Sequence, residues 1–376
     1  MITNKILDIS LQNDINTFLY ESLPMCIIRG KHNLYEWFLN HYVDLYLASA
    51  KKDGLYKYYR IRHVECTMYG GYSKLNEVIS SSKVESKVIN NKLNIVDFLK
   101  ENINNDTYAI VFLNEWAIPH KANYHSKHWY HESLVYGYDD EKGVLYCISF
   151  NENQTFTTFE VDYHSFWDGF QLICNDPADI GEYQRYVTLL KVSPVEYEFD
   201  FNRFVHQLNN FINGTIDLVD KYNFDLIDFF TDRDDWEYSF GYKIYDKFID
   251  IINKRKKTKN ELNGFLDDFE FFEYFDFHIL YEHKKIMQQR IEFINRKYFN
   301  SELTSIVQQY SQIVEAFEKL RLLNIKFSQI YRFGTITQNK IDDYANRFID
   351  ILRQNKEKEK ELFLQIYTFI SQKLLT

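Results

Sequence analysis

Apolar and polar residues follow different periods in different parts of this chain. In residues 33–50 the apolar side chains recur near a 3.6-residue period, which predicts an amphipathic helix. Residues 56–172 instead contain short apolar runs of strand length, such as TYAIVFL and GVLYCISF, separated by polar turn sequences. From about residue 195 onward, long helical patterns return. These patterns predict an α+β fold with a mainly antiparallel sheet, followed by an all-helical region.

The change of pattern also predicts where the chain divides. The stretch VSPVEYEFDFNR contains a proline and separates the strand-rich region from the helical one. At 376 residues the chain exceeds the usual ~100 to 200 residues of one domain. We therefore expect one domain over residues 1–194 and a bundle of about five helices over residues 195–376. The turn sequence DDEKG predicts a hairpin between two strands of the first domain.

Composition excludes several functions. The net charge of -10 comes from acidic residues scattered along the chain, and no basic face is concentrated enough to collect phosphates, so nucleic acid is not an expected partner. No apolar run approaches the ~20 residues that span a bilayer. Residues 1–20 lack the basic start and the small-residue cleavage site of a signal peptide. We expect a cytoplasmic protein without membrane contacts, whose many aromatic residues fill its core.

The cysteines give no sign of a disulfide framework or a thiolate zinc site, because they are far apart and form no CxxC pair. We expect four reduced thiols, no bound metal and no cofactor. The four are Cys26, Cys66, Cys147 and Cys174. The last two fall in apolar runs and are expected in the core.

Histidines are concentrated between residues 120 and 131, which hold four of the 11 in the chain. They are His120, His125, His128 and His131. His131 directly precedes the apolar run ESLVYGY, and a histidine at a strand start can act as a general base near neutral pH. Two alternatives remain: polar loop histidines without a role, and a metal site, although HxxHxxH spacing suits a helix better than a loop.

The segment NEWAIPHKANYHSKHWYHESLVYGYDDEKGVLY resembles the butirosin-biosynthesis acyltransferase family, and the resemblance covers roughly residues 20–170. The sequence YEHKKIMQQRIEF at 281–293 also resembles the helical region of relatives from peptide-synthetase clusters. The resemblance implies a papain-like fold related to bacteriocin-processing cysteine peptidases. It further implies amide formation in antibiotic biosynthesis, with the acyl group moving from a carrier-protein thioester to an amine.

The resemblance also implies a thiolate nucleophile, for which Cys26 is the candidate, with His131 as its base. The family places its cysteine at a helix start, where this chain reads GKHNLYEW, so Cys66 or the absence of a nucleophile remain alternatives. A buried cysteine that acts as a small apolar residue is the competing interpretation of Cys26. Asn151 is the candidate that orients the histidine, since Ser149 stands where the family commonly has Asp. Ordinary turn chemistry in NENQ is the competing interpretation of Asn151.

Glu115, Tyr124 and His128 are the candidate substrate-binding residues. Glu115 could orient a histidine, bind an amine, or be an exposed charge at a strand end. The expected partners are an acyl or peptidyl carrier protein and a small amine acceptor, and a homodimer is compatible with the sequence. The alternative functions are a scaffold or carrier-binding protein without catalysis, a thioesterase or peptidase, and a metal-dependent hydrolase.

Overall fold

The structure is a computed structural model that describes residues 3–52, 55–64, 75–92, 94–175, 181–216, 236–257, 272–333 and 336–374. The chain forms two compact units, and each combines two separate segments. The first unit comprises residues 1–38 and 67–197, and the second comprises residues 39–66 and 198–376. The fold class is α+β, with antiparallel sheets and a C-terminal helical region.

The junction at residue 197 lies near the expected boundary, but residues 39–66 belong with the second unit instead of the first. Their two strands pair with Trp236–Phe240, far along the chain. Such a discontinuous unit leaves no mark in a linear hydrophobic pattern, because the pattern reports local period and not the pairing partner.

The first unit contains a seven-stranded antiparallel sheet in the order β4-β9-β5-β6-β7-β8, with β1 also paired to β6. Its strands are β1 (Asn4–Ile6), β4 (Ile79–Glu85), β5 (Thr107–Asn114), β6 (Tyr130–Asp139), β7 (Val144–Phe150), β8 (Phe156–Asp162) and β9 (Tyr186–Val192). Its helices are α1 (Leu19–Arg29), α2 (Tyr35–Asn40, whose last two residues count with the second unit), α3 (Ser86–Lys92), α4 (Ile95–Asn104) and α5 (Tyr163–Asn175). Short 3₁₀ turns are η1 (His32–Leu34), η2 (Leu75–Glu77), η3 (Glu115–Ala117) and η4 (Glu182–Arg185).

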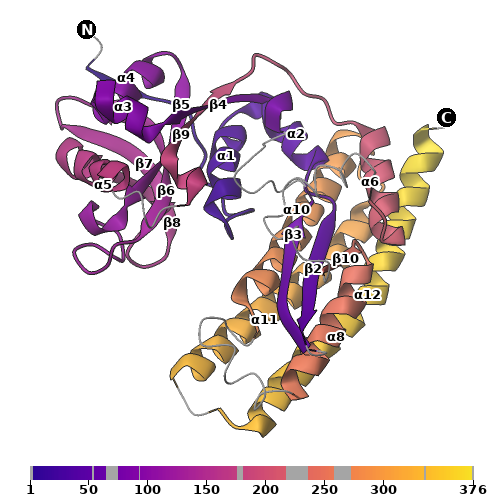
Figure 1. The fold of residues 1–376 in the computed structure, drawn as a ribbon. Coiled ribbons are helices and arrows are strands. Elements are labelled where there is room, and N and C mark those ends of the chain that lie inside the picture. The colour runs from indigo at the N-terminus through magenta and orange to yellow at the C-terminus, as the bar shows by residue number, and fades with distance from the viewer. Residues whose placement is uncertain are drawn as a thin grey trace. The chain divides into compact units, whose positions relative to one another are not determined.

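The helices of this unit cover opposite faces of the sheet. Helices α3, α4 and α5 contact one another on one face, and α1 contacts β6 and β7 from the other (Figure 1). We call these the α4 face and the α1 face. The division matters for the site because neighbouring residues of a strand point to opposite faces.

The hairpin expected at DDEKG is confirmed between β6 and β7. Asp139 Oδ1 accepts backbone hydrogen bonds from Glu141 (2.9 Å) and Lys142 (3.2 Å), and Gly143 has φ +68°. A side-chain acceptor followed by a glycine in the left-handed region closes the turn in the way the sequence predicts.

The first helix was expected in residues 33–50, and this prediction is wrong in part. Helix α2 ends at Asn40, and Leu45–Lys52 form strand β2. The actual first helix, α1, contains Pro24, which is normally a helix-breaking signal. Every residue from Leu19 to Ile28 is buried, so tertiary packing makes this segment helical although its proline disfavours a helix.

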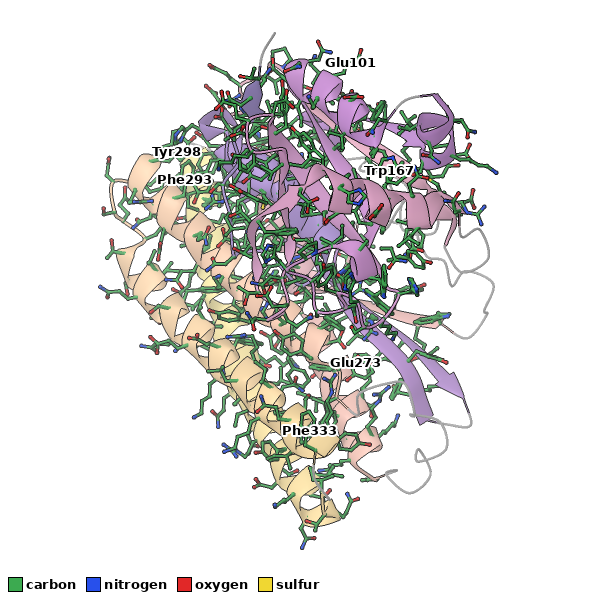
Figure 2. The ribbon with its side chains drawn as sticks, turned by 90° about the vertical axis from the view of Figure 1, so that its left-hand side faces the viewer. Glu101, Trp167, Glu273, Phe293, Tyr298 and Phe333 are labelled. Atoms are coloured by element: carbon green, nitrogen blue, oxygen red, sulfur yellow. The ribbon has the colours of Figure 1, made fainter. Side chains whose placement is uncertain are left out.

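The second unit joins a three-stranded antiparallel sheet, in the order β10-β2-β3, to long helices (Figure 1). The strands are β2 (Leu45–Lys52), β3 (Leu55–His63) and β10 (Trp236–Phe240). The described helices are α6 (Phe201–Asn213), α8 (Lys243–Lys257), α10 (Tyr274–Lys297), α11 (Thr304–Phe333) and α12 (Gln338–Leu374). Aromatic rings of this unit pack against one another, as with Phe293 of α10 and Tyr298 directly after this helix, whose centroids lie 6.0 Å apart (Figure 2).

One ionic cluster, which we call the Lys284 centre, connects four helices of this unit. Lys284 Nζ of α10 lies 2.8 Å from Glu359 Oε1 of α12. Tyr245 of α8 and Tyr310 of α11 each donate to the same carboxylate at 2.6 Å. His283 adds a contact of 3.2 Å from its Nδ1 to Lys284 Nζ. Because each of the four helices contributes at least one polar group to this buried cluster, the cluster fixes their register.

Candidate general-base site around His131

His131 lies at the start of β6, where it pairs with Leu113 of β5. Its side chain is 29% exposed. The face it occupies follows from the strand register. Tyr138 bonds Asn104 at the end of α4, and its partner Leu145 shares a face of β7 with Cys147. Cys147 pairs with Val135, which alternates back through Ser133 to His131. His131 therefore points to the α4 face.

Glu115 is the direct partner of His131. It follows β5 as the first residue of η3, and its backbone N–H donates to Trp129 O at 2.8 Å, which continues the strand pairing by one step. This pairing places Glu115 Oε1 2.9 Å from His131 Nδ1. The carboxylate thus holds the imidazole with Nδ1 as the donor and leaves Nε2 with its lone pair. No described residue bonds Nε2.

The carboxylate of Glu115 is buried but remains ionised. Burial by itself would raise its pKa, yet the hydrogen bond with His131, the Lys121 ammonium and the Asn123 amide together lower the pKa below its usual value. Asn123 Nδ2 donates to Glu115 Oε2 at 2.6 Å, and Lys121 Nζ lies 3.7 Å from Oε1. A negative charge fixed in this way stabilises the imidazolium that forms when His131 accepts a proton.

Lys121 is buried in the same cluster, and its Nζ donates to Phe150 O at 2.8 Å. Burial lowers the pKa of Lys121 to about 8, although Glu115, Cys147 and Glu132 act in the opposite direction. Neither Lys121 nor Asn123 was predicted from the sequence. Their spacing from Glu115, six and eight residues, places them in an irregular loop whose path no periodic pattern predicts.

The other histidines of the cluster have different surroundings. His120 and His125 adopt φ of 71° and 51°, a left-handed conformation in which histidine is enriched among non-glycine residues. Asn114 Nδ2 lies 3.0 Å from His128 Nδ1, so the Asn114 amide donates a hydrogen bond to this ring nitrogen. Within the described ranges, no group of three or more His, Cys, Asp or Glu side chains is arranged to hold a metal ion.

Exposed rings surround the loop that carries these histidines. Tyr124 is 41% exposed and stacks on His125 with centroids 4.0 Å apart, and His125 lies 4.7 Å from Trp116. Trp129 is 49% exposed. Tyr124 and His128, the two candidate substrate-binding residues of this loop, are therefore accessible, whereas Glu115 is occupied by His131, Asn123 and Lys121.

The structure does not bring Cys26 to His131. Cys26 lies inside α1, fully buried, on the α1 face, whereas His131 points to the α4 face. Burial raises the pKa of Cys26 to about 12, with a backbone hydrogen bond from Gln12 opposing this effect. A nucleophilic thiolate needs an accessible site near a positive group or a helix N-terminus, and Cys26 has neither.

The remaining thiols give no better nucleophile among the residues that the structure covers. Burial raises the pKa of Cys147 to about 12 and that of Cys174 to about 11. Cys147 is a core residue of β7, as expected. Cys174 is only half-buried in α5, so the expectation of a core position is wrong for this residue. Cys66, the alternative nucleophile, lies outside the described residues.

Asn151 belongs to a turn and does not orient His131. Its Oδ1 accepts hydrogen bonds from the backbone N–H groups of Asn153 (2.9 Å) and Thr155 (3.0 Å) between β7 and β8. The turn interpretation of NENQ accounts for this geometry, and Glu115 takes the orienting place that Asn151 was expected to fill.

No protein-family model matches this chain, and a search of curated proteins finds no significant match. Along the described parts of the chain, no helix combines the length and apolar character needed to cross a membrane. The class defined by fold and site is therefore an α+β protein with a Glu-oriented histidine at a strand start.

Proposed function

We propose that His131 acts as a general base in acyl transfer, and that the acceptor attacks the acyl donor directly, without an acyl-cysteine intermediate. The observation that carries this proposal is the 2.9 Å contact between Glu115 Oε1 and His131 Nδ1, which leaves Nε2 free of protein partners in the described structure. A general base with this support typically contributes ~10²- to 10⁴-fold to rate.

The class of reaction comes from the resemblance, which implies a papain-like fold and a carrier-protein thioester as donor. In the proposed step, His131 Nε2 removes a proton from the amine as the new C–N bond forms. The C–S bond then breaks, and the imidazolium returns the proton to the leaving thiolate. Water in place of the amine gives hydrolysis, with the same proton balance.

Direct attack is favoured over an acyl-enzyme because the nearby nucleophiles are inaccessible. Ser133 follows His131 on the same face, but it is 1% exposed and cannot meet a substrate. Cys147 is fully buried, and its raised pKa keeps it a neutral thiol.

The test uses the full chain with acyl thioesters of N-acetylcysteamine, with and without small amines, and follows thiol release with a chromogenic thiol reagent. The proposal expects release by the parent that falls at least ~100-fold in His131→Gln. Intact-mass spectra of quenched reactions should show no acylated protein. Equal rates in parent and variant would disprove the proposal.

A second candidate is a binding or scaffold protein without catalysis, which the raised pKa values of all described thiols favour. The same assay distinguishes it: a parent protein that binds an acyl carrier protein, as measured by calorimetry, but releases no thiol would support this candidate and refute the first.

A further inference from the structure

We infer that Lys121 is a positioning residue that shares the Glu115 carboxylate with His131, so that protonation of either cation disfavours protonation of the other. This inference rests on the general-base function proposed above, and it assigns to the same site a built-in response to pH.

The shared atom is Glu115 Oε1. It lies 2.9 Å from His131 Nδ1 and 3.7 Å from Lys121 Nζ, whereas Oε2 is bonded to Asn123. Two cations held beside one carboxylate oxygen titrate as a coupled pair, because the two positive charges lie close together and repel each other.

The surroundings of Lys121 hold its side chain in place whether the amine is charged or neutral. It is 3% exposed, its Nζ donates to Phe150 O, and the Phe159 ring centroid lies 5.2 Å away. The other titratable groups whose charges act on it are Cys147 on β7 and Glu132 on β6. Glu132 is buried on the α1 face, and burial raises its pKa.

The consequence for the site depends on pH. Burial lowers the pKa of Lys121 to about 8, so the ammonium is lost just above neutral pH. Once Lys121 is neutral, the charge of Glu115 acts on His131 alone and the imidazolium is better stabilised. The positive charge of Lys121 is therefore present beside His131 near neutrality and is lost as the pH rises.

The experiment measures the ring resonances of His131 by NMR over a pH range in the full-length protein without substrate, with His131→Gln providing the assignment. In Lys121→Met we expect the titration midpoint of these resonances to move upward by about one pH unit. The matched control is Lys127→Met, which removes an exposed lysine of the same loop that lies over Trp129, and there we expect no shift.

The parent protein supplies a second reading that does not depend on the folding of a variant. Its His131 resonances should show a smaller inflection near pH 8, where Lys121 titrates. An unchanged midpoint in folded Lys121→Met, an equal shift in Lys127→Met, or a parent without the second inflection would overturn the inference. Because no substrate is present, a coupled but inactive protein would refute only the general-base function.

Discussion

Lysine, glutamate and histidine meet in each of the two units, and the two clusters differ in whether the histidine has an open nitrogen. In the Lys284 centre, His283 Nε2 donates to Val43 O at 2.8 Å, and Nδ1 faces the lysine. In the first unit, His131 uses only Nδ1 and is 29% exposed. Residue type alone does not distinguish structure from chemistry; an unbonded, accessible nitrogen does.

The two carboxylates differ in the same way. Glu359 is fully buried and accepts hydrogen bonds from Lys284, Tyr245 and Tyr310, so its carboxylate is satisfied within the protein. Glu115 also has several partners, but one of them is a histidine whose far nitrogen is open. A closed network stabilises a fold, whereas a network with one open end can transfer a proton.

The largest effect on stability is expected from breaking the Lys284 centre. Glu359→Gln removes the charge that compensates buried Lys284, and we expect a loss of about 3 to 5 kcal/mol in the free energy of unfolding. Denaturant titration measures it. The matched control is Asp246→Asn, which removes an exposed partner of Lys356 and should cost less than about 1 kcal/mol. Similar losses in the two variants would refute the assigned role.

A substitution in the site around His131 should instead lower activity. Glu115→Gln keeps the shape of the side chain but removes the charge that supports the imidazolium, and we expect thiol release to fall about 100-fold with a folded protein. Glu132→Gln is the control, since it changes the adjacent carboxyl, which points to the other face of the sheet. If Glu132→Gln lost as much activity as Glu115→Gln, the pair of Glu115 and His131 would not be the active group.

A pH-dependent contribution to stability is expected in the second unit from Asp276. Burial raises its pKa to about 7, with Glu273 acting in the same direction and Arg60 and Arg62 against it. Between about pH 4 and pH 7 the folded protein holds a proton that the unfolded chain has released, so this group lowers stability as the pH rises. In Asp276→Asn, melting temperatures at about pH 5 and pH 8 should lie closer together than in the parent. An unchanged gap would contradict the assignment.

The smallest effect is expected from Cys26→Ala. The thiol is buried on the α1 face, so its removal should cost about 1 kcal/mol of stability and leave thiol release unchanged. The same assay and a denaturant titration measure both. Loss of activity in a folded Cys26→Ala protein would restore the acyl-cysteine mechanism that the resemblance implies.

The sequence predicted those parts of the fold that depend on local pattern. The β6–β7 hairpin follows from DDEKG, and the helices after residue 195 follow from their period. The extent of the helix expected over residues 33–50 was wrong, because Leu45 and Leu47 fit a helical period equally well but lie in a strand between β3 and β10. Pairing partners so distant are set by tertiary packing and leave no local signal.

The site was predictable to a similar degree. His131 was found from the density of histidines and its place before a strand, and Glu115 was named as a residue able to orient a histidine. Asn151 and Cys26 were assigned by resemblance, which transfers a position but not the face of the sheet to which it points. The feature that distinguishes Lys121 is that it is buried although it lies in a polar loop, and burial is not visible in a sequence.

The discontinuous second unit has a consequence for synthesis on the ribosome. Strand β2 lies between β3 and β10, yet β10 follows β3 by roughly 170 residues, which at ~5 to 20 residues per second take on the order of 10 to 35 seconds to translate. During that interval one edge of β2 has no strand to pair with. A nascent chain in this state exposes unpaired N–H and C=O groups and becomes a target for chaperones or for another growing chain.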